Sequence, residues 1–204
     1  MHNKLKFFVL FLLCLGLSAN ATDKYSMRVA YGTASTNNLG SIISGNLGSS
    51  SKSLSAVAVD GGYLLKKDLF DFPIDIYAKG GLSYFNEQNY KNTYEILAYV
   101  KAFYNIDFLD NRVRFGFGEG GSYVEHVLEV EDDEAIAENG NTSHFLNYLD
   151  ISLDFDIGKL IKYKAMHGTY FGILLKHRSG IFGLINNVSS GGSNYNSIYL
   201  ERNF

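Results

Sequence analysis

The residues best suited to chemistry are His177 and Ser179, which stand two positions apart near the C-terminus. Residues two apart in a β-strand point to the same face of the sheet. A serine hydroxyl is a weak nucleophile until a nearby base accepts its proton, and an imidazole is such a base. If both residues lie on one strand, they predict a nucleophilic serine activated by a histidine.

The segment that carries this pair, Gly168 to Ser179, has the alternation of a strand. Lys176 and Arg178 occupy the face opposite to His177 and Ser179. In the wall of a membrane barrel one face meets lipid, where a cation at mid-membrane depth is costly, and the other meets the interior. We therefore expect Lys176 and Arg178 to point inward, which leaves His177 and Ser179 facing lipid.

The N-terminus has the three parts of a cleaved secretory signal: a basic start, an apolar run from Phe7 to Leu17, and the small residues Ala19 to Ala21. The apolar run is shorter than the about 20 residues that a membrane-spanning helix needs, and no later stretch supplies one. The sequence predicts a signal peptide over residues 1–21 and one mature domain over residues 22–204. Any residence in a membrane must then be through strands.

Charge and cysteine content narrow the possible functions. Without the two lysines of the signal, the 18 basic residues become 16 against 21 acidic ones, a net charge of −5. There is no basic patch, so nucleic-acid binding is not supported. The only cysteine, Cys14, lies in the signal, which leaves no thiol for disulfides, metal ligation or nucleophilic catalysis. Lipid attachment at Cys14 is a less favoured alternative, because Leu13 is bulky where a small residue is needed.

The mature chain alternates apolar and polar residues in eight segments separated by turn-forming residues. Its 21 glycines, 15 tyrosines and 15 phenylalanines with a single proline fit strands, turns and interface aromatics. The fold class is therefore all-β, an eight-stranded antiparallel up-and-down transmembrane barrel with short periplasmic turns and longer outside loops. The expected strands are 25–34, 54–65, one that begins near Pro73, 93–107, 112–123, 144–157, 168–179 and 193–204.

The interior of this barrel is expected to be filled. Eight strands close around a space that side chains occupy, and the cations and anions with inward parity nearly balance. The sequence therefore predicts an ion-paired core and no pore. The inward cations are Arg28, Lys79, Lys101, Arg112, Arg114 and Lys176, and the inward anions are Asp60, Asp75, Glu95, Asp150 and Asp154.

Three further segments have simpler interpretations. The Ser/Gly/Asn tract from Ser35 to Ser53 predicts a flexible outside loop. The acidic segment from Glu125 to Glu138 lacks the spacing of a calcium loop and predicts a solvated face. The glycines from Gly116 to Gly121 resemble a phosphate loop, but no helix pattern follows them, so close packing of strands explains them better.

Four polar residues occupy outward-facing positions, where apolar residues are expected on a lipid-facing wall. They are Glu119, Asn147, His177 and Ser179. All four fall toward the exterior ends of three neighbouring strands, so they are expected to converge on one patch at the height of the outer leaflet. The alternative is that each lies in the polar head-group zone, where it costs little.

The chain ends in Phe204, an aromatic residue that closes an alternating strand. In this it resembles the outer-membrane barrels of Gram-negative bacteria. The resemblance implies an integral protein of the outer membrane, inserted by the barrel-assembly machinery through this last strand.

A more specific resemblance comes from His177-Arg178-Ser179, followed by a Gly/Asn-rich loop and the last strand. This pattern is similar to the His-x-Ser motif of the outer-membrane lipid A 3-O-deacylase family, the acyloxyacyl-hydrolase-like barrels, and Gly116 to Tyr123 resembles a glycine-rich strand there. The resemblance implies that Ser179 is the nucleophile and His177 the base, with an acid to orient it. It also implies lipid A of the outer-leaflet lipopolysaccharide as substrate and no cofactor.

The chain departs from that family in two places. Gly180 follows the serine where the family usually has Asn. The acid is expected in the last loop or at the start of the last strand, but this region has no carboxylate before Glu201, which has inward parity at the periplasmic end. We expect Glu119, one strand beyond the neighbour of His177, to act as the acid. Amides can bind a developing oxyanion, and the candidates for this role are Asn147, Asn186, Asn187 and Asn194.

The sequence thus favours an ester hydrolase that removes a 3-O-linked acyl chain from lipid A on the lipid-facing wall. A non-catalytic structural or adhesive barrel, acting through its outside loops, is the main alternative. A small transporter or lipid-binding barrel with an open interior is a third.

Overall fold

The computed structural model describes residues 24–204. The expected signal peptide, residues 1–21, lies outside this range. Among the described residues, no helix is long and apolar enough to cross a bilayer.

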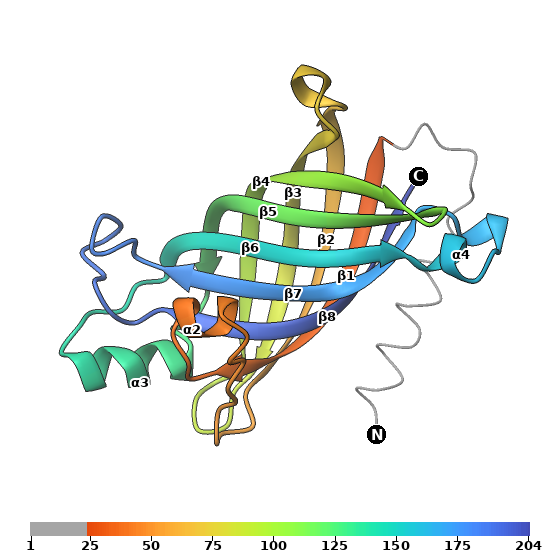
Figure 1. Cartoon of the computed structure of the whole chain (residues 1–204). Coiled ribbons are helices and arrows are strands. Elements are labelled where there is room, and N and C mark those ends of the chain that lie inside the picture. Colours follow the sequence, from red (N-terminus) through yellow and green to blue (C-terminus); the bar gives the residue numbers. More distant parts are fainter. Residues whose placement is uncertain (1–23) are drawn as a thin grey trace.

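Eight antiparallel strands follow one another around a closed barrel, because β1 pairs with β8 as well as with β2 (Figure 1). The expected all-β, up-and-down topology is confirmed, and the expected strand limits differ from the observed ones by only a few residues. The strands are β1 (Tyr25–Ser35), β2 (Ser55–Lys66), β3 (Ile74–Asn86), β4 (Thr93–Phe108), β5 (Asn111–Val124), β6 (Phe145–Asp156), β7 (Thr169–Ser179) and β8 (Ser193–Asn203).

Short helices occupy the connections at both ends of the barrel. Helices α2 (Leu39–Ile43) and α3 (Glu129–Glu138) lie at the same end as the β7–β8 loop, which we call the outer end (Figure 1). Helix α4 (Ile157–Leu160) and the C-terminus lie at the opposite, inner end. Two 3-10 turns, Leu69–Asp71 and Lys164–Met166, complete the connections at the inner end.

The interior is packed with ion pairs, as expected. Arg28 is 1% exposed and its guanidinium lies 2.7 Å from both Asp60 and Asp150. A buried charge is tolerated when it is paired, so opposite charges fill the barrel, some on neighbouring strands and most on strands that face each other across the interior. The other interior pairs are Lys79–Glu201, Lys79–Asp60, Lys101–Asp150, Arg114–Asp154, Arg114–Glu201, Lys176–Glu95 and Arg178–Glu95.

The outer surface of the wall is apolar between two levels of aromatic residues. Tyr94 and Tyr104 mark these levels on β4 and are 60% and 45% exposed. Between them Ile96 and Val100 point outward and are also exposed. A band of this kind suits lipid, with aromatic side chains at each interface.

Two outside loops are more structured than their composition predicted. The β1–β2 loop contains α2, whose Ile42 is 5% exposed. The acidic segment forms α3, and the prediction of a solvated face is wrong for Glu129 and Glu131, both 0% exposed. Glu131 pairs with Arg178 at 2.6 Å, so an interior cation holds the start of α3 over the barrel.

The glycines of β5 serve close packing, as expected. A Cβ on Gly120 would lie 2.2 Å from the carbonyl oxygen of Ala98, and one on Gly118 would lie 2.9 Å from the ring of Tyr99. Larger residues would push β5 away from β4 and its inward tyrosine.

Candidate active site on the outer wall

The two faces of β7 are divided as the sequence predicted. Lys176 and Arg178 are 3% and 0% exposed and pair with interior carboxylates. His177 and Ser179 point to the other face and are half-buried on the outer wall. The cost of an unpaired cation in lipid fixes this orientation.

His177 is held by Asn194 of β8, its direct cross-strand neighbour. The Nδ1 atom of His177 lies 2.8 Å from Oδ1 of Asn194. The Nδ2 group of Asn194 donates to the backbone carbonyl of Asn37 at 3.0 Å. A carbonyl can only accept, so this second bond fixes the orientation of the amide. Oδ1 must then accept from Nδ1–H, so the lone pair of the neutral ring is on Nε2, as a base requires. The backbone of Ser193 is a further hydrogen-bond partner of the imidazole.

Ser179 lies beside Asn147, its cross-strand neighbour on β6. Side chains of such pairs stand about 5 Å apart, so the Asn147 amide, 8% exposed, is adjacent to the serine hydroxyl. Within residues 24–204, Ser179 makes no hydrogen bond to His177. Their Cα atoms are two residues apart on the strand, about 7 Å, and catalytic hydrogen bonds in ligand-free enzymes are often long and tighten when substrate binds.

Glu119, the expected acid, does not contact His177. It lies in the same row of outward-facing residues, but Leu149 of β6 stands between the two. Strands are spaced by about 5 Å, so two spacings separate the carboxylate from the imidazole, and Glu119 is exposed.

The two expected amides of the β7–β8 loop have other partners. Asn186 donates to Ser143 Oγ at 3.0 Å and to the carbonyl of Phe145 at 2.8 Å, which ties the loop to β6. Asn187 is exposed and accepts through its backbone carbonyl from Asn141. Both have positive φ, 52° and 57°, a conformation that asparagine tolerates well. The contacts of Asn186 and Asn187 are those expected of residues that stabilise a turn.

The glycine after the serine has a packing explanation. A Cβ on Gly180 would lie 2.0 Å from the carbonyl oxygen of Val188. The β7–β8 loop folds back so closely that no side chain fits there. The amide that the resembled family usually carries at this position has no room here, which leaves Asn147 as the amide next to Ser179.

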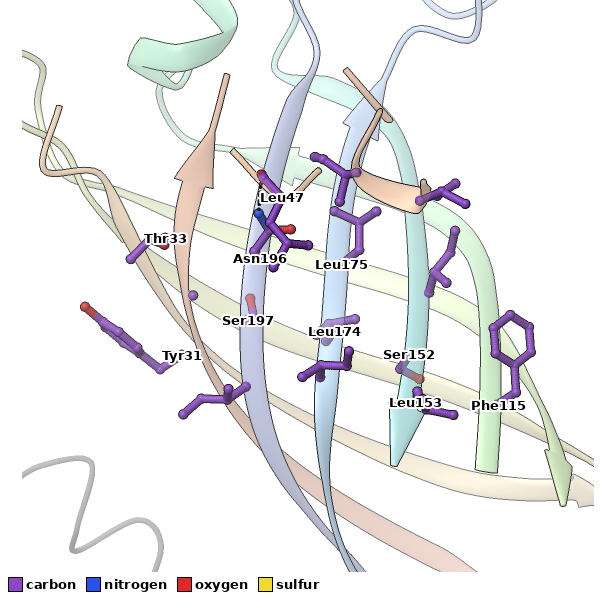
Figure 2. Close-up of a pocket in the computed structure, with 16 residues that line it drawn as sticks. Tyr31, Thr33, Leu47, Phe115, Ser152, Leu153, Leu174, Leu175, Asn196 and Ser197 are labelled. Atoms are coloured by element: carbon purple, nitrogen blue, oxygen red, sulfur yellow. Dashed lines mark hydrogen bonds between the residues drawn. The ribbon is translucent and has the colours of Figure 1, made fainter. Parts of the chain in front are cut away.

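An apolar groove lies on the outer wall (Figure 2). It begins two residues along β7 and β8 from the His177–Asn194 pair. Leu175 and Asn196, the next outward residues on β7 and β8, form its upper end. The groove has a volume of about 610 Å³. Ile42, Ile43 and Leu47 of the β1–β2 loop, together with residues of β1, β5, β6, β7 and β8, complete its lining.

The loop is fixed to the wall beside the groove. Asn196 Nδ2 donates to the carbonyl of Leu47 at 2.9 Å, the bond drawn in Figure 2. Ser35 Oγ donates to the same carbonyl at 2.6 Å. The groove was not predicted from the sequence, although a signal was present: the Ser/Gly/Asn tract that was expected to be a flexible outside loop contains the apolar residues Leu39, Ile42, Ile43 and Leu47.

The closed barrel of eight antiparallel strands, with an apolar band outside and ion pairs inside, is the fold of small outer-membrane barrels. Among solved structures, the chain is similar to the outer membrane enzyme PagL, with a TM-score of 0.60 and 11% identity over 88% of this chain and 99% of that chain. It is also similar to Neisserial surface protein A (NspA), with a TM-score of 0.50 and 10% identity over 90% of this chain and 98% of that chain.

No protein-family model matches the chain, and no curated sequence does either. At 10–11% identity, the structural similarities show a shared fold. One of the two similar structures is called an enzyme and the other a surface protein, so function has to be argued from the site.

Proposed function

We propose that this chain is an ester hydrolase of the outer membrane that removes a 3-O-acyl chain from lipid A by serine–histidine catalysis on its lipid-facing wall. The observation that carries the proposal is the His177–Asn194 pair, set beside Ser179 and two residues along β7 and β8 from an apolar groove. A hydrolase whose substrate never leaves the bilayer needs its nucleophile on the outside of the barrel, next to a place for an acyl chain.

The fold supports residence in an outer membrane, and we propose lipopolysaccharide of the outer leaflet as the partner. We extend the proposal to insertion by the barrel-assembly machinery through β8. Phe204 stacks on Tyr25 with ring centroids 6.1 Å apart, and the two residues also pair through their backbones. The terminal aromatic thus lies at the seam where β1 and β8 close the barrel.

In the proposed reaction the Ser179 hydroxyl gives its proton to Nε2 of His177, and its oxygen attacks the ester carbonyl carbon. The resulting oxyanion faces the amide of Asn147, which can donate to it. His177 then protonates the sugar oxygen, the carbon–oxygen bond breaks, and the acyl chain remains on Ser179. A water molecule, deprotonated by the same imidazole, releases the fatty acid and restores the serine.

The orienting residue in this scheme is a neutral amide. Asn194 accepts from Nδ1–H and so holds His177 in the tautomer with a free Nε2, the part that asparagine plays in cysteine–histidine–asparagine proteases. It stabilises the imidazolium less than a carboxylate does, because it carries no net charge. We therefore expect a slower chemical step than in a triad with an acid.

A non-catalytic surface barrel is the second candidate. It is favoured by the missing hydrogen bond between Ser179 and His177 among the described residues, and by the similarity to a protein called a surface protein. In that case His177 and Asn194 only fix the β1–β2 loop to the wall.

The deciding experiment replaces Ser179 by alanine. Lipid A from Gram-negative cells expressing the wild-type chain should lose one ester-linked acyl chain, and cells expressing Ser179→Ala should keep it, as measured by mass spectrometry. Ser189→Ala, an exposed serine of the same loop, is the matched control and should behave as wild type. Loss of the chain in the Ser179→Ala cells would refute the mechanism. Intact lipid A with all three proteins folded in the membrane would favour the surface barrel.

A further inference from the structure

A second, polar cavity lies at the outer end, between the β1–β2 loop, α3 and the start of β8. We call it the outer cleft. Its volume is about 450 Å³, and hydroxyl and amide groups of Ser35, Asn37, Ser50 and Asn194 are part of its lining. Its character is opposite to that of the apolar groove on the wall.

The outer cleft and the apolar groove meet at the proposed active site. Asn194 lines the cleft and Asn196 lines the groove, and both point outward from β8 two residues apart. Two residues of a strand span about 7 Å. His177 is paired with Asn194, so it lies at the junction. If an amphiphile places its head group in the cleft and an acyl chain in the groove, the bond that joins the head group to the chain lies next to this imidazole.

The charges that line the cleft favour ligand groups that donate hydrogen bonds over ligand groups that carry negative charge. Among residues 24–204, the one cation in its lining is Lys52, which is already paired with Glu129 at 2.9 Å and with Asp133. Glu134 and Glu138 add two further carboxylates to the lining. A phosphate entering the cleft would meet carboxylates and no free cation, and like charges at short range repel.

Helix α3 adds to this preference. One face of α3 lines the cleft from Val130 onward, and the last turn of the helix contributes Ala137 and Glu138. The C-terminus of a helix carries negative partial charge, and the last turn of α3 contains no basic residue to offset it. The helix and its side chains therefore both attract hydroxyl or ammonium donors.

We propose, resting on the proposed function, that the outer cleft receives the head group of the substrate and selects a sugar that presents hydroxyl or amine donors there. A sugar bearing a free phosphate at this place is disfavoured. The substrate class is thus an acylated glycolipid whose sugar next to the scissile ester is phosphate-free or has its phosphate masked by an amine.

The test compares two lipid A disaccharides, one carrying both phosphates and one with both removed, in mixed detergent micelles with a chelator to prevent bridging by divalent cations. The wild type should show a KM about tenfold lower for the phosphate-free lipid, as expected for one uncompensated charge contact. Glu138→Lys should remove this difference in KM. Glu125→Lys, which reverses an exposed charge that lines neither cavity, should keep it.

Equal KM values for both lipids in the wild type, or an equal response of both lysine variants, would overturn the proposal. Binding of the same lipids to the Ser179→Ala protein, measured by titration calorimetry, separates this result from a failure of the proposed function. If no lipid is hydrolysed but the phosphate-free one still binds about tenfold more tightly, the head-group selection by the cleft is supported and the proposed hydrolase function is refuted. If both lipids are hydrolysed with equal KM, the hydrolase function is supported and the head-group selection by the cleft is refuted.

Discussion

The inner and outer faces of β7 carry polar side chains in opposite settings. On the inner face Lys176 contacts Glu95 and Ser83, and Arg178 contacts two carboxylates and a backbone carbonyl. On the outer face His177 has one side-chain partner, the amide of Asn194. One strand thus presents charges that are neutralised and an imidazole whose second nitrogen is available.

The difference separates residues that hold the barrel together from residues that can react. A buried ion pair is stable only while both partners remain, so the inner face tolerates little change. Polar groups on a lipid-facing wall cost free energy and are functional candidates for that reason. Substitutions of the polar residues on the inner face should therefore affect stability, and those of the polar residues on the outer face should affect activity.

The largest effect is expected for Lys176→Met. It leaves Glu95, which is 0% exposed, without its closest cation, and removing one partner of a buried pair costs about 3–5 kcal/mol. Unfolding in urea, followed by the gel shift between folded and unfolded barrel, measures the loss. The double variant Lys176→Met with Glu95→Gln should recover most of it, because no buried charge is then left unpaired. A single variant as stable as the wild type would contradict the structural role of the inner face.

The second prediction puts a cation on the other face of the same strand. Ile173 is 59% exposed near the middle of β7, and Ile173→Lys should destabilise the barrel by about 2–4 kcal/mol, the cost of a lysine at mid-membrane depth on the lipid side. The control is Leu184→Lys in the β7–β8 loop, where the side chain is 82% exposed and lies beyond the strands. Equal stability of both variants in lipid vesicles would argue against a lipid-facing wall.

The sequence was sufficient to predict the faces of the strands. Alternation has period two, and a cation is costly in lipid, so Lys176 and Arg178 determine the orientation of His177 and Ser179 without any tertiary information. The ion-paired interior followed from the same parity, and the pair Arg28–Asp60 between β1 and β2 shows it directly.

The partners across strands were not predictable in the same way. The register of β8 against β7 depends on the path of residues 180–192, and that path depends on close contacts such as the one between Gly180 and Val188. Asn194 was therefore expected to bind an oxyanion, whereas the structure has it hydrogen-bonded to His177. Burial of Glu129 likewise depends on Lys52 and Asn89, which are distant in the sequence.

A smaller effect is expected for Asn194→Ala. The variant removes the acceptor for Nδ1–H of His177, so the imidazole loses its fixed tautomer, and kcat should fall about 10–100-fold. Stability should change by about 1 kcal/mol. Nitrogen NMR of the labelled imidazole gives a readout beyond activity: the wild type should carry its proton on Nδ1, and the variant should show a mixture of tautomers. An unchanged tautomer with unchanged kcat would exclude Asn194 as a positioning residue.

The smallest effect concerns the outer end, where Glu129 at the start of α3 contacts Asn89 and Lys52 of the neighbouring loops. Burial alone would raise the pKa of Glu129, but hydrogen bonds from the backbone of Asn89 and Gln88 and from Lys52 lower the pKa to about 2. A carboxyl with a lowered pKa in the folded state stabilises it above its ordinary pKa and loses this contribution as the pH falls. The protection factors of α3, which compare its hydrogen exchange with the intrinsic rate at each pH, should thus fall between about pH 4.5 and pH 2 while the strands stay protected, because the barrel does not depend on this contact. Glu129→Gln should give low protection factors in α3 that do not change with pH over that range, and a variant that still shows the acid transition would assign it to another carboxyl of the helix.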